Sequence, residues 1–472
     1  MNFIKKINII TLFAGILLIY SCNEKENKKG QEPEYVQRID SVMQIEFDYG
    51  ILNGSVLVAK NDTIIYEKTF GHTDATKTRK LNTSTIFNIG SIAKEFNGVA
   101  IMMLQERGLL HIDDPVSKFD LDLPAWAEKI KIRHLLNYAG GLPSMPNFGG
   151  DITNDEIAFN KVRNIDSLLF EPGTSFNYNN YSVFLQRRIV ENVTDQTFEA
   201  FVTQNIVTPL QLTTAVFDPD ETHDDRAFCY DKDNIPCPKF AFISGWLWMN
   251  AHDLFTWIQA MNNNQLISQK SFDVLLRNPY TPKLASSLGE FFENEQLQRH
   301  DGSAYGFRSI MLNDFKNDVV IIIILNNTGP SIKLGHMTHS IVLEKEFSVV
   351  KKSIYDKLKN VFFEDVNEGI RTYNGLKETA SEAYEFNDPE ELNKLGYEAL
   401  RAGNVEGGIE TIQLAVTEFP EYANLYDSLG EMYLTNEQDN LALENYKKAI
   451  ALGGTNGNAK AMVLKIQEMK NN

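Results

Sequence analysis

The feature that most constrains the fold of this chain is the run from Val319 to Leu325, which holds only valine, isoleucine and leucine. A run of this kind is typical of a strand that is buried on both faces. Turn-forming residues at 314–317 separate it from the apolar stretch 309–312, and this arrangement predicts a hairpin. A second hairpin is expected much earlier, where strands at 55–59 and 63–66 flank Asn61-Asp62.

Helical patterns dominate the long stretch between the two hairpins. A further helix is expected before the first hairpin, from Glu34 to Phe47, where apolar residues recur at steps of three and four. These patterns predict an α+β fold, in which an antiparallel sheet is flanked by helices and carries an inserted helical region. A crevice between the sheet and the inserted helical region is the expected ligand site.

The length and charge of the chain indicate how many domains it has and which partners it does not bind. A chain of 472 residues is too long for one ordinary core, so two or three domains are expected. The formal net charge of −18 argues against binding to nucleic acid or electrostatic docking on anionic lipid.

The first residues have the pattern of a secretory signal. Two lysines at positions 5 and 6 precede an apolar run from Ile7 to Tyr20, which is short for a membrane-spanning helix. Residues 18–22 resemble a bacterial lipobox, which implies lipidation of Cys22 after removal of residues 1–21. Residues 22–34 are then a flexible tether, and the protein is expected at the bacterial cell envelope, lipid-anchored and periplasmic or surface-exposed. The alternative is a signal cleaved elsewhere.

Two further cysteines, Cys229 and Cys237, lie close together in sequence. In an oxidising compartment they can form a disulfide that closes a small loop. The alternative is two free buried thiols, because the geometry of a disulfide cannot be read from sequence. No Cys/His spacing typical of a metal site occurs in the chain.

The tail from 389 to 472 contains an internal repeat. Leu395-Gly396 returns as Leu429-Gly430, and Ala415 returns as Ala449, in both cases after 34 residues. This period resembles that of tetratricopeptide repeats, which are all-α and which bind peptides on a concave surface. Residues 346–388 are expected to be a helical linker that supports the repeats.

Chemistry is expected at Ser91 and Lys94, which open an apolar helix running to Gln105. Residues three apart share a helix face, so the lysine amine can approach the serine hydroxyl. A serine hydroxyl becomes a good nucleophile when an adjacent base takes its proton, and a buried lysine can be that base. The spacing alone is weak, because residues 348–351 repeat it in what looks like a surface helix.

The segments around each serine distinguish Ser91 from Ser348, the serine of the second Ser-x-x-Lys sequence. Residues 87–94, 108–116 and 132–143 resemble the nucleophile segment and its continuation in the class C β-lactamase-related and penicillin-binding-protein-like serine hydrolases. The resemblance covers residues 35–345. It implies that Ser91 is the nucleophile and that Tyr178, in Tyr178-Asn179-Asn180, shares the proton transfer with Lys94. It also implies that Asn180 binds Lys94 and the substrate carbonyl.

His300-Asp301-Gly302 is the third element of this family, in which a Lys/His-Thr-Gly strand lines the site. The resemblance implies an oxyanion hole made of the backbone N–H groups of Ser91 and Ser303. Gly302 allows the substrate to approach the strand closely. The alternative for His300 is a residue at a strand end with no chemical role.

Asp301 departs from the family pattern, because the residue usually found there is threonine. A carboxylate at this position would repel the carboxylate of a β-lactam or of a terminal D-Ala if it faced the cleft. The sequence therefore predicts a serine hydrolase that acts on an ester, amide or peptide bond, with weak or no β-lactamase activity and no metal or organic cofactor. The substrate is a small molecule or a peptide. The alternatives are a degenerate domain that binds without turnover, and an adaptor that recruits a protein partner through its tail.

Overall fold

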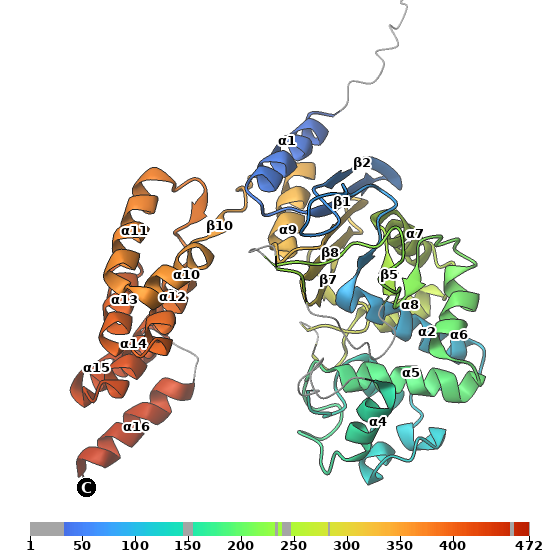
Figure 1. Cartoon of the computed structure of the whole chain (residues 1–472). Coiled ribbons are helices and arrows are strands. Elements are labelled where there is room, and N and C mark those ends of the chain that lie inside the picture. The colour runs from blue at the N-terminus through green and yellow to red at the C-terminus, as the bar shows by residue number, and fades with distance from the viewer. Residues whose placement is uncertain are drawn as a thin grey trace, which may run out of the picture.

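The computed structural model describes residues 33–144, 154–231, 235–237, 247–281, 284–453 and 457–471 (Figure 1). The expected signal peptide, Cys22 and most of the tether lie outside these residues. Within the described residues, no helix combines the length and the apolar character that crossing a bilayer requires.

A six-stranded antiparallel sheet organises the first two thirds of the chain. Its order is β2-β1-β9-β8-β7-β6. The strands are β1 (Gly54–Lys60), β2 (Thr63–Phe70), β6 (Glu290–Phe292), β7 (Leu297–Ala304), β8 (Phe307–Asp314) and β9 (Val319–Leu325). Strand β1 pairs with β9 in a register that runs from Gly54↔Leu325 to Lys60↔Val319. The two predicted hairpins are therefore confirmed, and they lie next to each other in one sheet.

Both faces of the sheet are covered, and this explains the unbroken apolar run of β9. Helices α1 (Glu34–Asp48) and α9 (Ser331–Val342) pack on one face, where Ile321 and Ile323 are buried. Helices α2 (Lys94–Glu106), α7 (Ala251–Asn262) and α8 (Gln269–Leu276) belong to the core on the other face, with Ile322 and Ile324. The α+β prediction is confirmed.

The inserted helical region lies between β2 and α7, beyond α2 (Figure 1). Its helices are α3 (Ile132–Leu136), α4 (Asp155–Arg163), α5 (Asn180–Thr194) and α6 (Phe198–Val202). A small sheet of β3 (Phe87–Asn88), β5 (Leu247–Met249) and β4 (Val216–Phe217) joins this region to the start of α2.

The chain after α9 is mostly helical in its described part, with one pair of two-residue strands. Its elements are β10 (Lys352–Ser353), α10 (Ile354–Glu364), α11 (Val366–Thr379), β11 (Tyr384–Glu385), α12 (Pro389–Arg401), α13 (Val405–Glu418), α14 (Ala423–Thr435), α15 (Asp439–Ala451) and α16 (Gly457–Asn471). Helices α10 and α11, in the stretch expected as a linker, share one core with α12 and α13, through residues such as Phe362 and Leu395. Residues 354–386 thus contribute to the helical unit, whereas Phe347 and Val350 pack in the core beneath α1.

The packing of the tail repeats with the sequence. In the first pair of helices, Gly396 of α12 lies against Ile412 of α13. In the second pair, Gly430 of α14 lies against Tyr446 of α15, which is the same contact 34 residues later. A residue without a side chain lets the two helices approach closely at this point. The assignment of these pairs as tetratricopeptide repeats stays a prediction.

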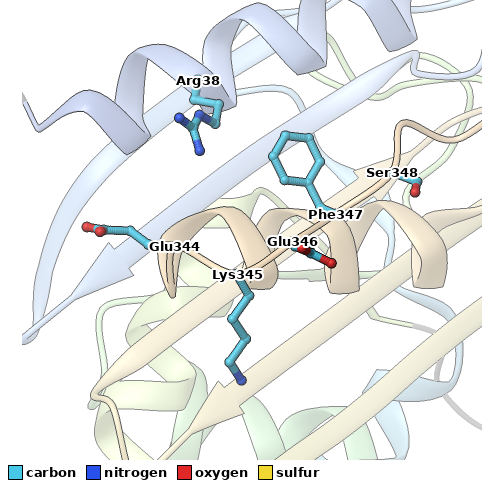
Figure 2. A pocket seen from close by; sticks show the side chains of 6 residues that line it. All are labelled: Arg38, Glu344, Lys345, Glu346, Phe347 and Ser348. Atoms are coloured by element: carbon cyan, nitrogen blue, oxygen red, sulfur yellow. The ribbon is translucent and has the colours of Figure 1, made fainter.

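One secondary-structure expectation was wrong. The stretch 348–351 has no regular secondary structure, because it belongs to the connection between α9 and β10. Figure 2 shows this connection beneath α1, with the ring of Phe347 between the connection and the helix. Ser348 and Lys351 are therefore not placed on one helical turn, as Ser91 and Lys94 are.

A buried carboxyl holds this connection against α1. Oε1 of Glu46 accepts a hydrogen bond from the backbone N–H of Val350 at 2.7 Å, and Oε2 is buried without a partner in the structure. Burial raises the pKa of Glu46 to about 7, although the Val350 N–H acts in the opposite direction. The packed state of the connection is therefore most stable when the Glu46 carboxyl is protonated.

Stability is expected to fall as the pH rises through this range. Between the pKa of an unfolded glutamate, about 4.3, and the folded value, the folded state binds more protons than the unfolded state. The free energy of unfolding should therefore fall by on the order of 3 kcal/mol between pH 5 and pH 8 through Glu46. In Glu46→Gln this part of the dependence should be absent. Urea unfolding at both pH values measures it, with Glu344→Gln, at an exposed carboxyl of the same connection, as the control.

Cys229 and Cys237 are both free thiols in the structure, so no disulfide joins them. They nevertheless lie side by side: the Cys237 N–H donates to the Cys229 carbonyl oxygen at 3.0 Å. The hydrogen bond between the thiols, together with burial, raises the pKa of Cys229. Redox conditions decide whether neighbouring thiols are joined, so the disulfide stays a prediction.

Candidate active site

Ser91 lies on a single tight turn between β3 and α2. This turn is a 3-10 helix, η1 (Gly90–Ala93). Gly90 has a φ of 58°, which glycine adopts without strain, and its N–H donates to Oδ1 of Asn88 at 2.8 Å. The turn places Ser91 just before the first residue of α2, Lys94.

Lys94 joins the predicted nucleophile to the predicted tyrosine. Its Nζ lies 2.7 Å from Oγ of Ser91 and 2.7 Å from Oη of Tyr178. Lys94 is buried, whereas Tyr178 is 39% exposed and can meet a substrate. The three side chains thus form a connected path for a proton between the serine and the surface.

Tyr178 and Asn180 are placed by the start of α5. Asn179 caps this helix, since its Oδ1 accepts from the N–H of Ser182 at 2.7 Å. Helix α5 packs on α2, where Nδ2 of Asn97 donates to the Val183 carbonyl oxygen at 3.4 Å. Asn180 is half-buried at the first position of α5, two residues after Tyr178.

Tyr138 is a site residue that sequence reasoning missed. Its φ of 53° is rare for a bulky side chain, and such backbone strain gathers at functional sites. Its ring lies 4.5 Å from the ring of Tyr178, centroid to centroid, and the two phenols are hydrogen-bonded. Burial and the neighbouring Tyr178 raise the pKa of Tyr138, so its hydroxyl keeps its proton. The only available signal was its place within the matched segment 132–143.

Strand β7 passes directly beside the nucleophile turn. A Cβ atom on Gly90 would lie 2.6 Å from the backbone nitrogen of Ser303, and one on Gly302 would lie 2.1 Å from the carbonyl oxygen of Ile89. Oγ of Ser309 on β8 also donates to that carbonyl at 2.8 Å. The two glycines let the strand and the turn approach closely, which brings the Ser303 N–H next to Ser91.

The four predicted residues of β7 divide between its two faces. His300 and Gly302 are buried on the side of α2, and the side chains of Asp301 and Ser303 are exposed on the other side. His300 is not a strand end, because β7 continues to Ala304. Its Nδ1 lies 2.8 Å from Oε1 of Glu95, a buried residue that sequence reasoning also missed.

An antiparallel sheet with a helical insertion, together with a serine, a lysine and a tyrosine at its edge, defines the class of β-lactamase and penicillin-binding-protein-like proteins. The family model described as Beta-lactamase matches residues 33–340. The chain belongs to the beta-lactamase family.

Relatives of known sequence agree with this placement. Protein flp of Staphylococcus aureus (strain MW2) is 28% identical over 360 residues, covering 69% of this chain and 70% of that protein. The putative penicillin-binding protein PbpX of Bacillus subtilis (strain 168) is 27% identical over 330 residues, covering 67% of this chain and 81% of that protein.

Solved structures share the fold. A penicillin-binding protein homologue from Pyrococcus abyssi, described as octameric, has a TM-score of 0.58 and 22% identity over 69% of this chain and 81% of its own. FmtA from Staphylococcus aureus has a TM-score of 0.57 and 22% identity over 68% of this chain and 94% of its own.

Proposed function

We propose that the protein is a serine hydrolase that cleaves an ester, amide or peptide bond through an acyl-enzyme on Ser91. The observation that carries this proposal is the position of Lys94, whose Nζ is 2.7 Å from both the Ser91 hydroxyl and the Tyr178 phenol. Hydrogen-bonded contact between a nucleophile and a base is the arrangement that nucleophilic catalysis needs.

The reaction has two steps. Oγ of Ser91 attacks the substrate carbonyl carbon, and its proton passes to the Lys94–Tyr178 pair. The N–H groups of Ser91 and Ser303 stabilise the oxyanion. The pair returns the proton to the leaving group, whose bond to the carbonyl carbon breaks. Water then attacks the acyl-enzyme and releases Ser91.

We further propose that common penicillins and cephalosporins are poor substrates. Asp301 stands where the family has threonine, and its exposed carboxylate lies on the strand that passes the nucleophile. The Asp301 side chain lies on the face of β7 opposite His300, so the main effect of the replacement is the loss of the threonine hydroxyl, a hydrogen-bond donor for a substrate carboxylate.

A fluorophosphonate probe with intact-mass detection tests the proposed chemistry. We expect a single adduct on the wild-type protein, no adduct on Ser91→Ala, and full labelling of Ser348→Ala, the serine of the second Ser-x-x-Lys sequence. Labelling that persists in Ser91→Ala would contradict the assignment. No adduct with any acylating probe would favour a domain that binds without turnover. Efficient turnover of a penicillin by the same preparation would overturn the substrate proposal.

We also propose that this chemistry takes place at the cell envelope, with a lipid on Cys22 as the anchor. The basic start, the short apolar run and the lipobox-like residues 18–22 support the proposal. Incorporation of a labelled fatty acid should be lost in Cys22→Ser, and incorporation that survives this change would refute the anchor.

A further inference from the structure

Next to the catalytic lysine, the carboxyl group of Glu95 is buried in the interior. Glu95 is 1% exposed, and nitrogen atoms of three side chains contact its carboxyl group. Trp257 Nε1 donates to Oε2 at 2.7 Å, and Gln298 Nε2 donates to Oε1 at 3.4 Å. His300 Nδ1 lies 2.8 Å from Oε1. A buried carboxyl is expensive unless it is satisfied in this way, so its presence calls for an explanation.

Glu95 joins the elements that carry the two halves of the proposed oxyanion hole. It belongs to α2, which follows the turn of Ser91, and its partners Gln298 and His300 belong to β7, which supplies the Ser303 N–H. Trp257 comes from α7, and its ring stacks on Phe96 of α2 at 3.9 Å between centroids. The carboxyl group therefore connects α2, β7 and α7 at one point.

The hydrogen bonds also determine the orientation of His300. An ionised carboxylate only accepts hydrogen bonds, so with Glu95 ionised the bond to the imidazole has Nδ1–H as its donor. In a neutral imidazole this arrangement corresponds to the tautomer that has hydrogen on Nδ1 and none on Nε2. A carboxylate that orients a histidine in this way is a familiar means of preparing an active site.

We propose that Glu95 is a positioning residue for the hydrolase. It keeps His300 in the Nδ1–H form and keeps β7 in register with the Ser91 turn, so that the Ser303 N–H meets the oxyanion as it forms. Glu95 does not touch the substrate and acts through its neighbours. The inference rests on the proposed function of Ser91.

The kinetic test compares two glutamates of the same helix. Glu95→Gln keeps the shape but replaces one acceptor with a donor, whereas Glu106→Gln makes the same change at the exposed end of α2, where Glu106 accepts hydrogen bonds from Ser268 and Ser271. With the fluorophosphonate probe, the rate of adduct formation at saturating probe should fall about 10- to 100-fold in Glu95→Gln, because small misplacements at the reacting atoms cost rates of this order. The probe concentration at half-maximal rate should change less than about threefold, and Glu106→Gln should match the wild type in both.

A double-variant comparison shows whether Glu95 works through His300. If it does, adding Glu95→Gln to His300→Asn should slow labelling by less than about threefold further, because coupled residues are not additive. Full additivity would contradict the proposal, and so would wild-type kinetics in folded Glu95→Gln. A fall in the folded fraction, without a change in the rate per folded molecule, would assign Glu95 a structural role only.

A wild-type protein that is not labelled at all would refute the proposed function of Ser91. The role of Glu95 can still be tested in that case, by a measurement that needs no activity. With ¹⁵N-labelled histidine, the ring nitrogen signals of His300, identified by their loss in His300→Asn, should show hydrogen on Nδ1 in the wild type. Glu95→Gln should alter this pattern, and Glu106→Gln should not. A wild-type His300 without hydrogen on Nδ1 would overturn the inference.

Discussion

Lys94→Met should lower the rate of Ser91 acylation by about 1000-fold and leave the fold intact. Methionine has nearly the length of lysine and suits a buried position, so the change removes the amine without opening a cavity. Without the amine, the Ser91 hydroxyl loses the group 2.7 Å away that takes its proton, and Tyr178 loses its link to the serine. Proton transfer by a positioned group is worth roughly 10²- to 10⁴-fold in rate.

The second Ser-x-x-Lys sequence provides the matched control. Lys351→Met makes the same chemical change in the connection to the tail, where Nζ of Lys351 donates to the carbonyl oxygen of Ser381. Labelling by the fluorophosphonate should be unchanged in this variant. A Lys94→Met protein that reacts at the wild-type rate would show that another group activates the serine.

Gly302→Ala should also abolish most of the activity, by a different route. The added Cβ would lie 2.1 Å from the Ile89 carbonyl oxygen and 2.2 Å from Oγ of Ser309, which is too close for any real contact. Since the first of these atoms is backbone, β7 must move away from the Ser91 turn. The Ser303 N–H then leaves the oxyanion, and loss of one such donor lowers the rate by about 10²- to 10³-fold.

The control for this prediction is Gly375→Ala in α11. A Cβ there would meet nothing within 4 Å. Alanine favours a helix over glycine by about 1 kcal/mol, so this variant should be fully active and equally or slightly more stable. Labelling rates and urea unfolding measure both variants. Wild-type labelling of Gly302→Ala would mean that the strand and the turn do not cooperate in binding the oxyanion.

Local patterns were sufficient for much of the fold and for the centre of the site. The run 319–325 is buried on both faces as expected, and Asn61 and Asp62 have the positive φ values, 51° and 57°, that a tight hairpin turn needs. Ser91 and Lys94 are three residues apart, so their contact follows from helix geometry over one turn.

Local patterns were insufficient where a residue's environment comes from distant parts of the chain. The pattern of residues 348–351 predicts a helix that the structure lacks, because the packing of the connection against α1 cannot be read from its own sequence. The sequence indicated helices that support the repeats, but it did not show which residues of α10 and α11 enter the core of α12 and α13.

The sequence by itself thus determined the sheet, through side-chain periodicity, and it predicted Ser91 and Lys94 through their spacing together with the family resemblance of the segments around them. Only the tertiary structure decided which groups surround them. Glu95 and His300 are 205 positions apart, and Tyr138 meets Tyr178 across two loops, so neither contact has a local signature. Such contacts exist because the sheet and the helical insertion close on each other, and burial then requires every polar group in the interface to find a partner.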